Sequence, residues 1–170
     1  PSWRSDRALF ALGVAGLSRF LAEVDLETGA FVERMALPEA AAFPRVAPDG
    51  DTLLVNLGEP LNRIGRGSIR AGTFAPWGAF EGFSYPIWSP DGQYIYFAHF
   101  TPSAVDNTAP FSYTMERLPM AGGTATGPAE VILKDALWPS LSADGSELVY
   151  VYSDPKDYTN NLFISNSDGT

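Results

Sequence analysis

Histidine is the one residue type whose unperturbed pKa lies near neutrality, and this sequence has a single one, His99. Nucleophilic catalysis would need a serine or cysteine held by that histidine and a third group that orients the ring. The sequence has no cysteine, no Gly-x-Ser-x-Gly motif, no phosphate-binding loop and no His-Glu-x-x-His metal motif. Two interpretations stay open: a structural histidine at a strand end, or a residue that lines a binding pocket.

Acidic residues are the other candidates, as metal ligands. Calcium prefers six to eight oxygen ligands, and no segment concentrates acids as an EF-hand loop does. Glu23, Asp25 and Asp168 are therefore interpreted as turn or strand-end residues. Four further aspartates recur periodically, which favours a repeated turn role over one active site: Asp6, Asp49, Asp91 and Asp144. The sequence predicts no metal site and no cofactor.

The net charge of −9 argues against nucleic acid as a partner. A local basic cluster, Arg63, Arg66 and Arg70, is interpreted as a solvated edge strand. The sequence shows no apolar run that could span a membrane and no signal-peptide pattern, and the lack of cysteine excludes disulfides.

Residues 86–97 show which elements must position these side chains. Ser89–Gly92 (SPDG) has proline, aspartate and glycine in the order of a tight turn. Gln93–Phe100 follows with aromatic and β-branched residues, which predicts a strand. Tyr85 precedes Pro86, and a residue before proline favours extended backbone. The segment therefore predicts a hairpin.

The hairpin pattern recurs along the chain. Pro44–Gly50 and Pro139–Gly145 repeat it, Pro1–Arg7 is a weaker copy, and the four prolines lie 43, 42 and 53 residues apart. A repeat of about 40 to 45 residues with four short strands is typical of a propeller blade. We therefore predict an all-β fold, a β-propeller of four-stranded antiparallel blades. The three internal prolines each follow an aromatic residue: Phe43, Tyr85 and Trp138.

The pattern predicts one partial propeller domain over residues 1–170, with repeats at 1–43, 44–85, 86–138 and 139–170, the last incomplete. Residues 63–70 match a third strand poorly, because Gly65 and Gly67 weaken a strand interior. Residues 36–42 allow a short helical turn, limited by Pro38. Third strands are otherwise predicted near 20–26, 113–118 and 162–166, and fourth strands at 31–36, 73–80 and 130–133.

The motif PxWSPDGxxIxF at 86–97 resembles the TolB-type β-propeller repeat, also called the WD40-like (PD40) repeat. The copies at 44 and 139 keep Asp-Gly but carry Val46 and Leu141 in place of the tryptophan, and the first copy has Arg7 in place of the glycine. The resemblance covers nearly the whole chain and implies a propeller of about six to eight blades, of which about four are present. The remaining blades of the same propeller would then be a partner, and we expect this piece alone to aggregate or dimerise.

Loops on a rigid scaffold are where binding residues concentrate. The loops between second and third strands vary, and two are long and polar: Thr101–Ala109 and Ser153–Asn160. We predict that this face is the recognition surface; the alternative is that the loops are tolerated insertions. The candidate binding residues are His99, Phe100, Asp106, Asn107, Asp154, Lys156, Asp157 and Tyr158.

Three functions stay open. The TolB resemblance implies a non-catalytic scaffold that binds a protein or peptide partner in the bacterial cell envelope, periplasmic or extracellular, and we prefer this one. The alternative is the substrate-gating propeller of a serine peptidase similar to prolyl oligopeptidase, with its catalytic domain outside this chain. The third is an enzyme with a central pocket, for which the first strands offer few polar residues: Ser2, Arg4, Arg45, Ser89, Ser140 and Ser142.

Overall fold

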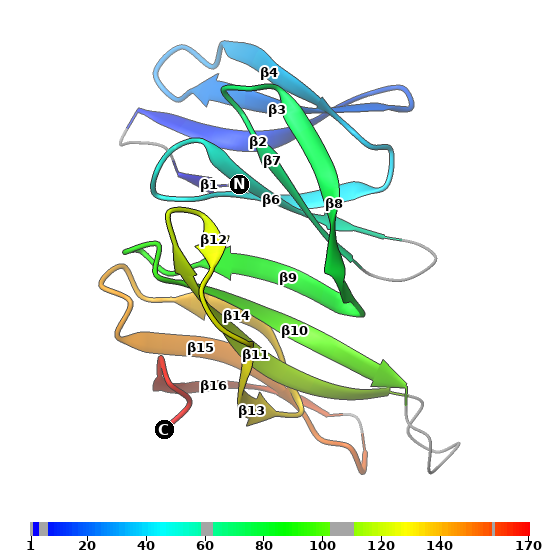
Figure 1. The fold of residues 1–170 in the computed structure, drawn as a ribbon, viewed down its shortest axis with the longest axis vertical. Coiled ribbons are helices and arrows are strands. Elements are labelled where there is room, and N and C mark those ends of the chain that lie inside the picture. Colours follow the sequence, from blue (N-terminus) through cyan, green and yellow to red (C-terminus); the bar gives the residue numbers. More distant parts are fainter. Residues whose placement is uncertain (1, 4–6, 59–62, 103–110, 158) are drawn as a thin grey trace. The chain divides into compact units, whose positions relative to one another are not determined.

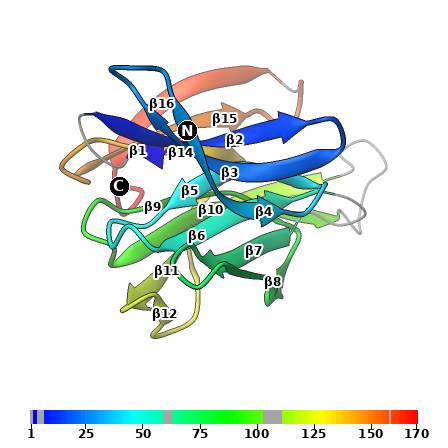
Figure 2. The same ribbon diagram turned by 90° about the horizontal axis from the view of Figure 1, so that it is seen from above.

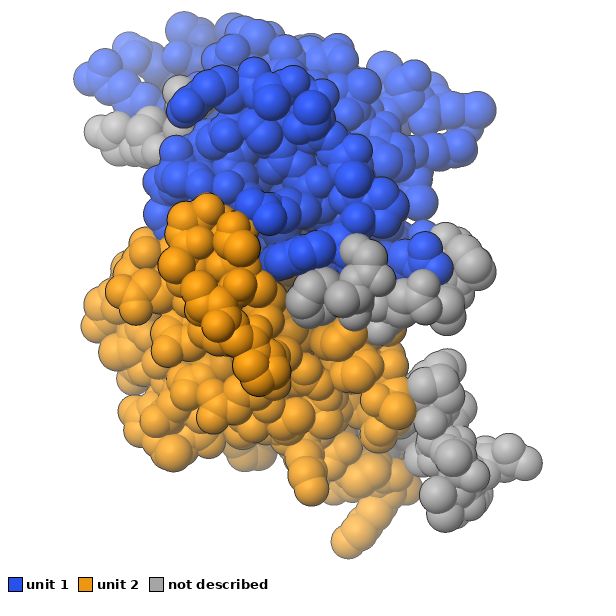
Figure 3. All heavy atoms as spheres, viewed as in Figure 1, with its two compact units in different colours: residues 1–81 blue, residues 82–170 orange. Residues whose placement is uncertain are grey.

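The computed structural model describes residues 2–3, 7–58, 63–102, 111–157 and 159–170. Every regular element in that part of the chain is a β-strand, so the all-β prediction is confirmed. The chain divides into two compact units, unit 1 (residues 1–81) and unit 2 (residues 82–170), coloured separately in Figure 3. Each unit holds two antiparallel sheets.

Unit 1 contains two four-stranded sheets in which consecutive strands pair. The first runs β1-β2-β3-β4 and the second β5-β6-β7-β8, and β2 lies beside β5 (Figures 1 and 2). The strands are β1 (Ser2–Trp3), β2 (Ala8–Ala15), β3 (Ser18–Asp25), β4 (Phe31–Leu37), β5 (Ala41–Val46), β6 (Thr52–Leu57), β7 (Arg63–Ser68) and β8 (Thr73–Glu81).

Unit 2 contains a five-stranded sheet and a three-stranded sheet. In the first, β11 pairs with β10, with the short β12 and with β13; in the second the order is β14-β15-β16. Strand β14 lies beside β9, β10 and β11 (Figure 1). The strands are β9 (Phe83–Trp88), β10 (Tyr94–Pro102), β11 (Phe111–Ala121), β12 (Thr124–Ala125), β13 (Glu130–Lys134), β14 (Ala136–Leu141), β15 (Glu147–Ser153) and β16 (Asn160–Asn166).

The second strand of a repeat carries the core of each unit. All six residues of β6 are buried, and Leu53 and Val55 join the side chains of the first sheet in one cluster. In unit 2, Tyr96 and Leu148 belong to a corresponding cluster between the two sheets. The burial of β6 on both faces fits a sheet packed on two sides. By contrast, Leu162 and Ile164 of β16 are 73% and 65% exposed.

Strand β7 forms despite its two glycines, and its neighbour supplies the reason. A Cβ built on Gly65 would overlap the ring of Phe74 on β8, and a Cβ on Gly67 would lie 3.0 Å from the same ring. The aromatic ring therefore fills the space that the missing side chains leave. Residues 38–40 form a turn rather than a helix, closed by a hydrogen bond from the Ala41 amide to the Pro38 carbonyl (2.9 Å).

The tight turns between first and second strands follow the sequence prediction. Gly50, Gly92 and Gly145 have φ of 71°, 71° and 75°, the left-handed region that glycine adopts without strain. The carboxylate one position earlier accepts hydrogen bonds from the turn; in the last turn, Asp144 accepts from the hydroxyl of Ser142 (2.6 Å) and the amide of Ser146 (3.1 Å). The recurrent aspartates are therefore turn residues, as predicted; Asp6 lies outside the described residues.

The aromatic residue before each internal proline is not extended, contrary to the prediction from the proline alone. Phe43, Tyr85 and Trp138 have φ of 51°, 56° and 51°. At each, the ladder skips, so that the aromatic–proline pair faces a single residue of the next strand. This is a β-bulge with a non-glycine residue in the left-handed conformation. The pairing of the two strands places one extra residue in the bulge, and this overrides the preference of a residue before proline for extended backbone.

Candidate functional site

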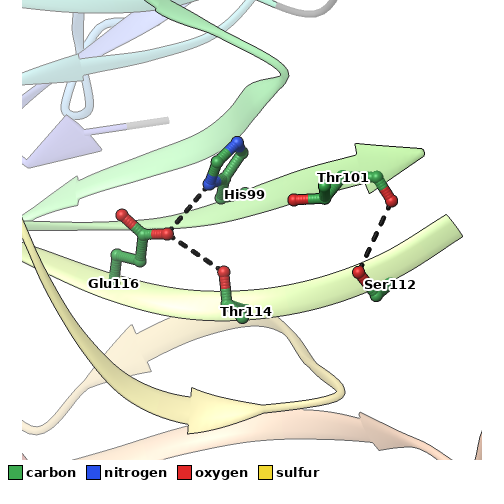
Figure 4. Close-up of polar contacts among 5 residues, drawn as sticks. All are labelled: His99, Thr101, Ser112, Thr114 and Glu116. Atoms are coloured by element: carbon green, nitrogen blue, oxygen red, sulfur yellow. Dashed lines mark hydrogen bonds and ion pairs between the residues drawn. The ribbon is translucent and has the colours of Figure 1, made fainter. Parts of the chain in front are cut away.

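His99 lies in a polar cluster at the end of β10 (Figure 4). Its Nδ1 is 2.9 Å from Oε1 of Glu116 on β11, and the hydroxyl of Thr114 donates to the same oxygen at 3.0 Å. Strand register explains the cluster: His99 faces Thr114 across the ladder, and Glu116 is the diagonal neighbour on the same face. Glu116 is buried, so these two donors satisfy a carboxylate that would otherwise be costly to bury.

The ring of His99 is also held from its other side. It stacks on Phe83 of β9 at 4.0 Å between centroids, with 15° between the planes. Glu116 can fix the tautomer with the proton on Nδ1, as orienting carboxylates do, and that leaves Nε2 as an acceptor. Within the described residues, no hydroxyl is hydrogen-bonded to Nε2. Glu116 and Phe83 thus orient the imidazole of His99.

Phe100, the next residue, belongs to a group of four aromatic side chains that we call the aromatic row. Trp138 and Tyr85 meet edge to face at 6.0 Å, Tyr85 and Phe100 are tilted at 6.4 Å, and Phe100 meets Tyr113 edge to face at 5.0 Å. The row therefore links β14, β9, β10 and β11 across the two sheets of unit 2. Such geometries are favourable for aromatic pairs.

The bulges determine how two members of the row are presented. At the bulge of β14, Pro139 is buried while Trp138 is 49% exposed; at the bulge of β9, Pro86 is buried and Tyr85 is half-buried. Phe43 is 49% exposed at the equivalent bulge in unit 1. The bulge turns the proline inward and the aromatic ring outward, at the cost of a strained backbone.

Acidic residues lie beside the row. The Asp135 amide donates to the carbonyl of Tyr113 (2.7 Å), and the Asp135 carbonyl accepts from the amide of Ser153 (2.8 Å), next to Asp154. Partial burial, and then the negative charges of Asp154 and Asp135, raise the pKa of the Tyr152 phenol. Asp135 and Asp154 therefore place two negative charges at the end of the β14–β15 hairpin that carries Tyr152.

Two of the predicted loop residues, Asp154 and Asp157, accept hydrogen bonds within the β15–β16 loop. The Asp154 carboxylate accepts from the amide of Lys156 (2.8 Å), and Asp157 accepts from the amide (2.9 Å) and hydroxyl (2.7 Å) of Thr159. These bonds stabilise the β15–β16 loop, so Asp157 has a turn role and Lys156 is exposed. His99, Phe100 and Asp154 lie in unit 2 with the row. Asp106, Asn107 and Tyr158 lie outside the described residues.

Sequence reasoning missed Trp138, Tyr85, Tyr113 and Asp135. The signal for the first two was present, since an aromatic residue precedes each internal proline. The exposure of these two rings depends on the bulge, and only the pairing of the strands shows the bulge. Asp135 has φ 55°, a conformation that aspartate tolerates better than most residues. It lies beside Tyr113 because it follows Lys134, which pairs with Thr114 in the β11–β13 ladder.

Among the described residues, no group of three or more histidine or acidic side chains is placed to hold a metal ion. Over the same part of the chain, no helix is long and apolar enough to cross a membrane. Unit 1 has an open pocket of about 380 Å³ between β4 and two turns, and the Asp51 carboxylate there already accepts hydrogen bonds from the Ser68 hydroxyl and the Arg70 amide. Its lining residues are Glu33, Arg34, Gly50, Asp51, Ile69 and Arg70.

No family model matches the chain, and no curated protein matches it. Solved structures do resemble it. TolB from Acinetobacter baumannii has a TM-score of 0.76 at 16% identity, covering 99% of this chain and 40% of that protein. A putative TolB from Agrobacterium tumefaciens has a TM-score of 0.68 at 20% identity, covering 95% and 57%. A prolyl endopeptidase has a TM-score of 0.65 at 14% identity, covering 96% and 27%.

These likenesses, with the four antiparallel sheets, show that the fold is that of a β-propeller, present in part. The chain spans less than two thirds of each of these proteins. At such identities the likeness concerns the fold, and a shared fold hosts different functions.

Proposed function

We propose that this chain is part of a non-catalytic β-propeller scaffold that binds a protein or peptide partner through the aromatic row of unit 2. One observation carries the proposal: Trp138 and Tyr85, which contact each other in the row, both occupy the left-handed conformation, and Trp138 is nevertheless 49% exposed. That conformation costs a non-glycine residue about 1–2 kcal/mol. Strain of this kind concentrates at functional sites, because the surrounding fold must hold it in place.

The row suits recognition of a protein or peptide for a second reason. Aromatic rings bury a large area with few rotatable bonds, and tryptophan and tyrosine are enriched among the residues that dominate binding energy. Trp138 is half-exposed while its partner Tyr85 supports it edge to face. A ring that is exposed yet held in one orientation is preorganised for a partner.

The cellular location is part of the same proposal. The repeat at 86–97 resembles the TolB type, and two of the structural neighbours are TolB proteins. This supports a scaffold of the bacterial cell envelope, periplasmic or extracellular, whose remaining blades belong to the same propeller.

Selection from a random peptide library displayed on phage tests the proposal. Peptides selected on the chain should lose about thirtyfold or more in affinity for the Trp138→Ala and Phe100→Ala variants, the loss expected of a binding hot spot. Phe31→Ala is the control, since Phe31 is an exposed aromatic of unit 1 outside the row. Peptides that bind all three variants as well as the parent chain contradict the proposal.

The likeness to a prolyl endopeptidase favours a second candidate, a substrate-gating propeller whose catalytic domain lies outside this chain. The sequence of the gene beyond both ends distinguishes the two. A downstream Gly-x-Ser-x-Gly on a strand–turn–helix supports the gating function. Further Asp-Gly hairpins behind a signal peptide support the binding scaffold.

A further inference from the structure

The negative charge of the chain is concentrated in the unit that carries the aromatic row. Residues 82–170 hold ten acidic and three basic residues, a net charge of −7, whereas residues 1–81 hold ten acidic and eight basic residues, a net charge of −2. A field of one sign attracts partners of the opposite sign and raises their rate of association. The row therefore lies in the half of the chain that favours a cationic partner.

Two acidic residues of unit 2, Asp135 and Asp154, lie next to strands that carry the row. The backbone of Asp135 is hydrogen-bonded to Tyr113, a member of the row, and to Ser153, the residue before Asp154. Both of these hydrogen bonds of Asp135 are made by its backbone, so neither uses its carboxylate. One oxygen of Asp154 accepts from the Lys156 amide, and the other is not used by that turn. Both carboxylates can accept from a bound partner.

Aromatic faces and carboxylates select the same kind of ligand group. An ammonium or guanidinium is attracted to the face of a tryptophan ring, and it forms charge-assisted hydrogen bonds with a carboxylate. A neutral or acidic ligand gains neither contribution, and an acidic one is repelled by the net charge of unit 2.

We infer that the segment bound by the aromatic row is a basic, extended peptide whose lysine or arginine side chains reach Trp138, Asp135 and Asp154. This inference rests on the proposed function and names the chemistry of its partner. The extended form follows from the row itself, which crosses four strands instead of enclosing a compact ligand.

The peptide selection described above also tests the inference when the charge of the selected peptides is scored. Peptides whose binding depends on Trp138 should be enriched in lysine and arginine relative to the unselected library. Replacing the basic residues of one such peptide by glutamine should weaken binding by about three- to thirtyfold at low salt, and the difference should shrink at 1 M salt.

Variants of the chain separate a specific contact from general charge. Asp135→Asn and Asp154→Asn should weaken the basic peptide and leave its glutamine counterpart unchanged; asparagine also tolerates the left-handed conformation at 135, so the fold is kept. Glu147→Gln is the control, because it removes one exposed charge at the far end of β15.

The possible results are distinguishable. Row-dependent peptides that are neutral or acidic overturn the inference and leave the proposed function standing. A preference for basic peptides that Glu147→Gln reduces as much as Asp135→Asn also overturns it, since the effect is then general charge. Failure to select any row-dependent peptide contradicts the proposed function, and the inference falls with it.

Discussion

The strained bulge at Trp138 predicts an inverted response to glycine. Trp138→Ala and Trp138→Gly both remove the ring and its contact with Tyr85, so the difference between them reports the backbone alone. At an ordinary strand position, replacing alanine by glycine costs about 0.5–1 kcal/mol of stability. At φ 51°, alanine carries a strain of about 1–2 kcal/mol that glycine avoids. The glycine variant should therefore be as stable as the alanine variant or more stable, by up to about 1.5 kcal/mol.

Ser140 supplies the matched control. It lies two residues further along β14, is exposed, and pairs regularly with Val149. There the glycine variant should be less stable than the alanine variant by about 0.5–1 kcal/mol. The two sites should thus differ by about 1–2 kcal/mol.

Thermal unfolding followed by circular dichroism can resolve this difference. For a chain of this size, 1 kcal/mol corresponds to roughly 2–4 °C in Tm, so the alanine-to-glycine changes at the two sites should differ by roughly 2–8 °C. If glycine lowers Tm equally at 138 and 140, the bulge is not strained and the reasoning fails.

Three further predictions concern the fold and the polar cluster. Gly65→Ala should destabilise the chain by about 1–3 kcal/mol in urea unfolding, because its Cβ would overlap the ring of Phe74. Gly58→Ala should be neutral or slightly stabilising, because its Cβ would make only an ordinary contact of 3.9 Å with the Ala40 carbonyl; equal effects would refute this. Glu116→Ala should destabilise by about 1–3 kcal/mol, because His99 and Thr114 lose their hydrogen-bond acceptor. His99→Ala should cost less in that background, giving a coupling of about 0.5–3 kcal/mol in a double-mutant cycle; additivity would contradict the pairing. The Ser142 hydroxyl, and then the amide and hydroxyl of Ser146, lower the pKa of Asp144 to about 2, below the roughly 3.9 of an unfolded aspartate. Its contribution to stability is therefore present above pH 4 and is lost as the pH falls to 2. The urea midpoint of Asp144→Asn should fall less over that range than the midpoint of the parent chain, and an equal fall would contradict this.

The hairpins could be predicted from the sequence because their signals are local. Proline, aspartate and glycine in order determine the turn at Ser89–Gly92, and an apolar run after it determines the strand. The sequence predicts β7 poorly, because the low strand propensity of glycine considers each residue alone. Phe74, a residue of the next strand, compensates for Gly65, and strand stability depends on such cross-strand neighbours.

The candidate site was predictable only in part. Phe100 was placed at the recognition face from its position at a strand end, and it does belong to the row. Trp138 and Tyr85 were noted in the repeat, yet a residue before proline is expected to be extended. The bulge that reverses this expectation depends on pairing between strands, and the proximity of Asp135 to Tyr113 depends on the register of β13 against β11.

The most direct test of the account is a two-dimensional nitrogen–proton NMR titration of the chain with one peptide selected from the phage library. The chain has four tryptophans, so four indole N–H signals can be assigned by substitution. The account predicts that the signal of Trp138 shifts on titration, together with the backbone amides of Phe100 and Tyr113, while the signal of Trp77 in unit 1 does not move. A peptide that binds and shifts the Trp77 signal, leaving that of Trp138 unchanged, would contradict the claim that the aromatic row is the recognition surface.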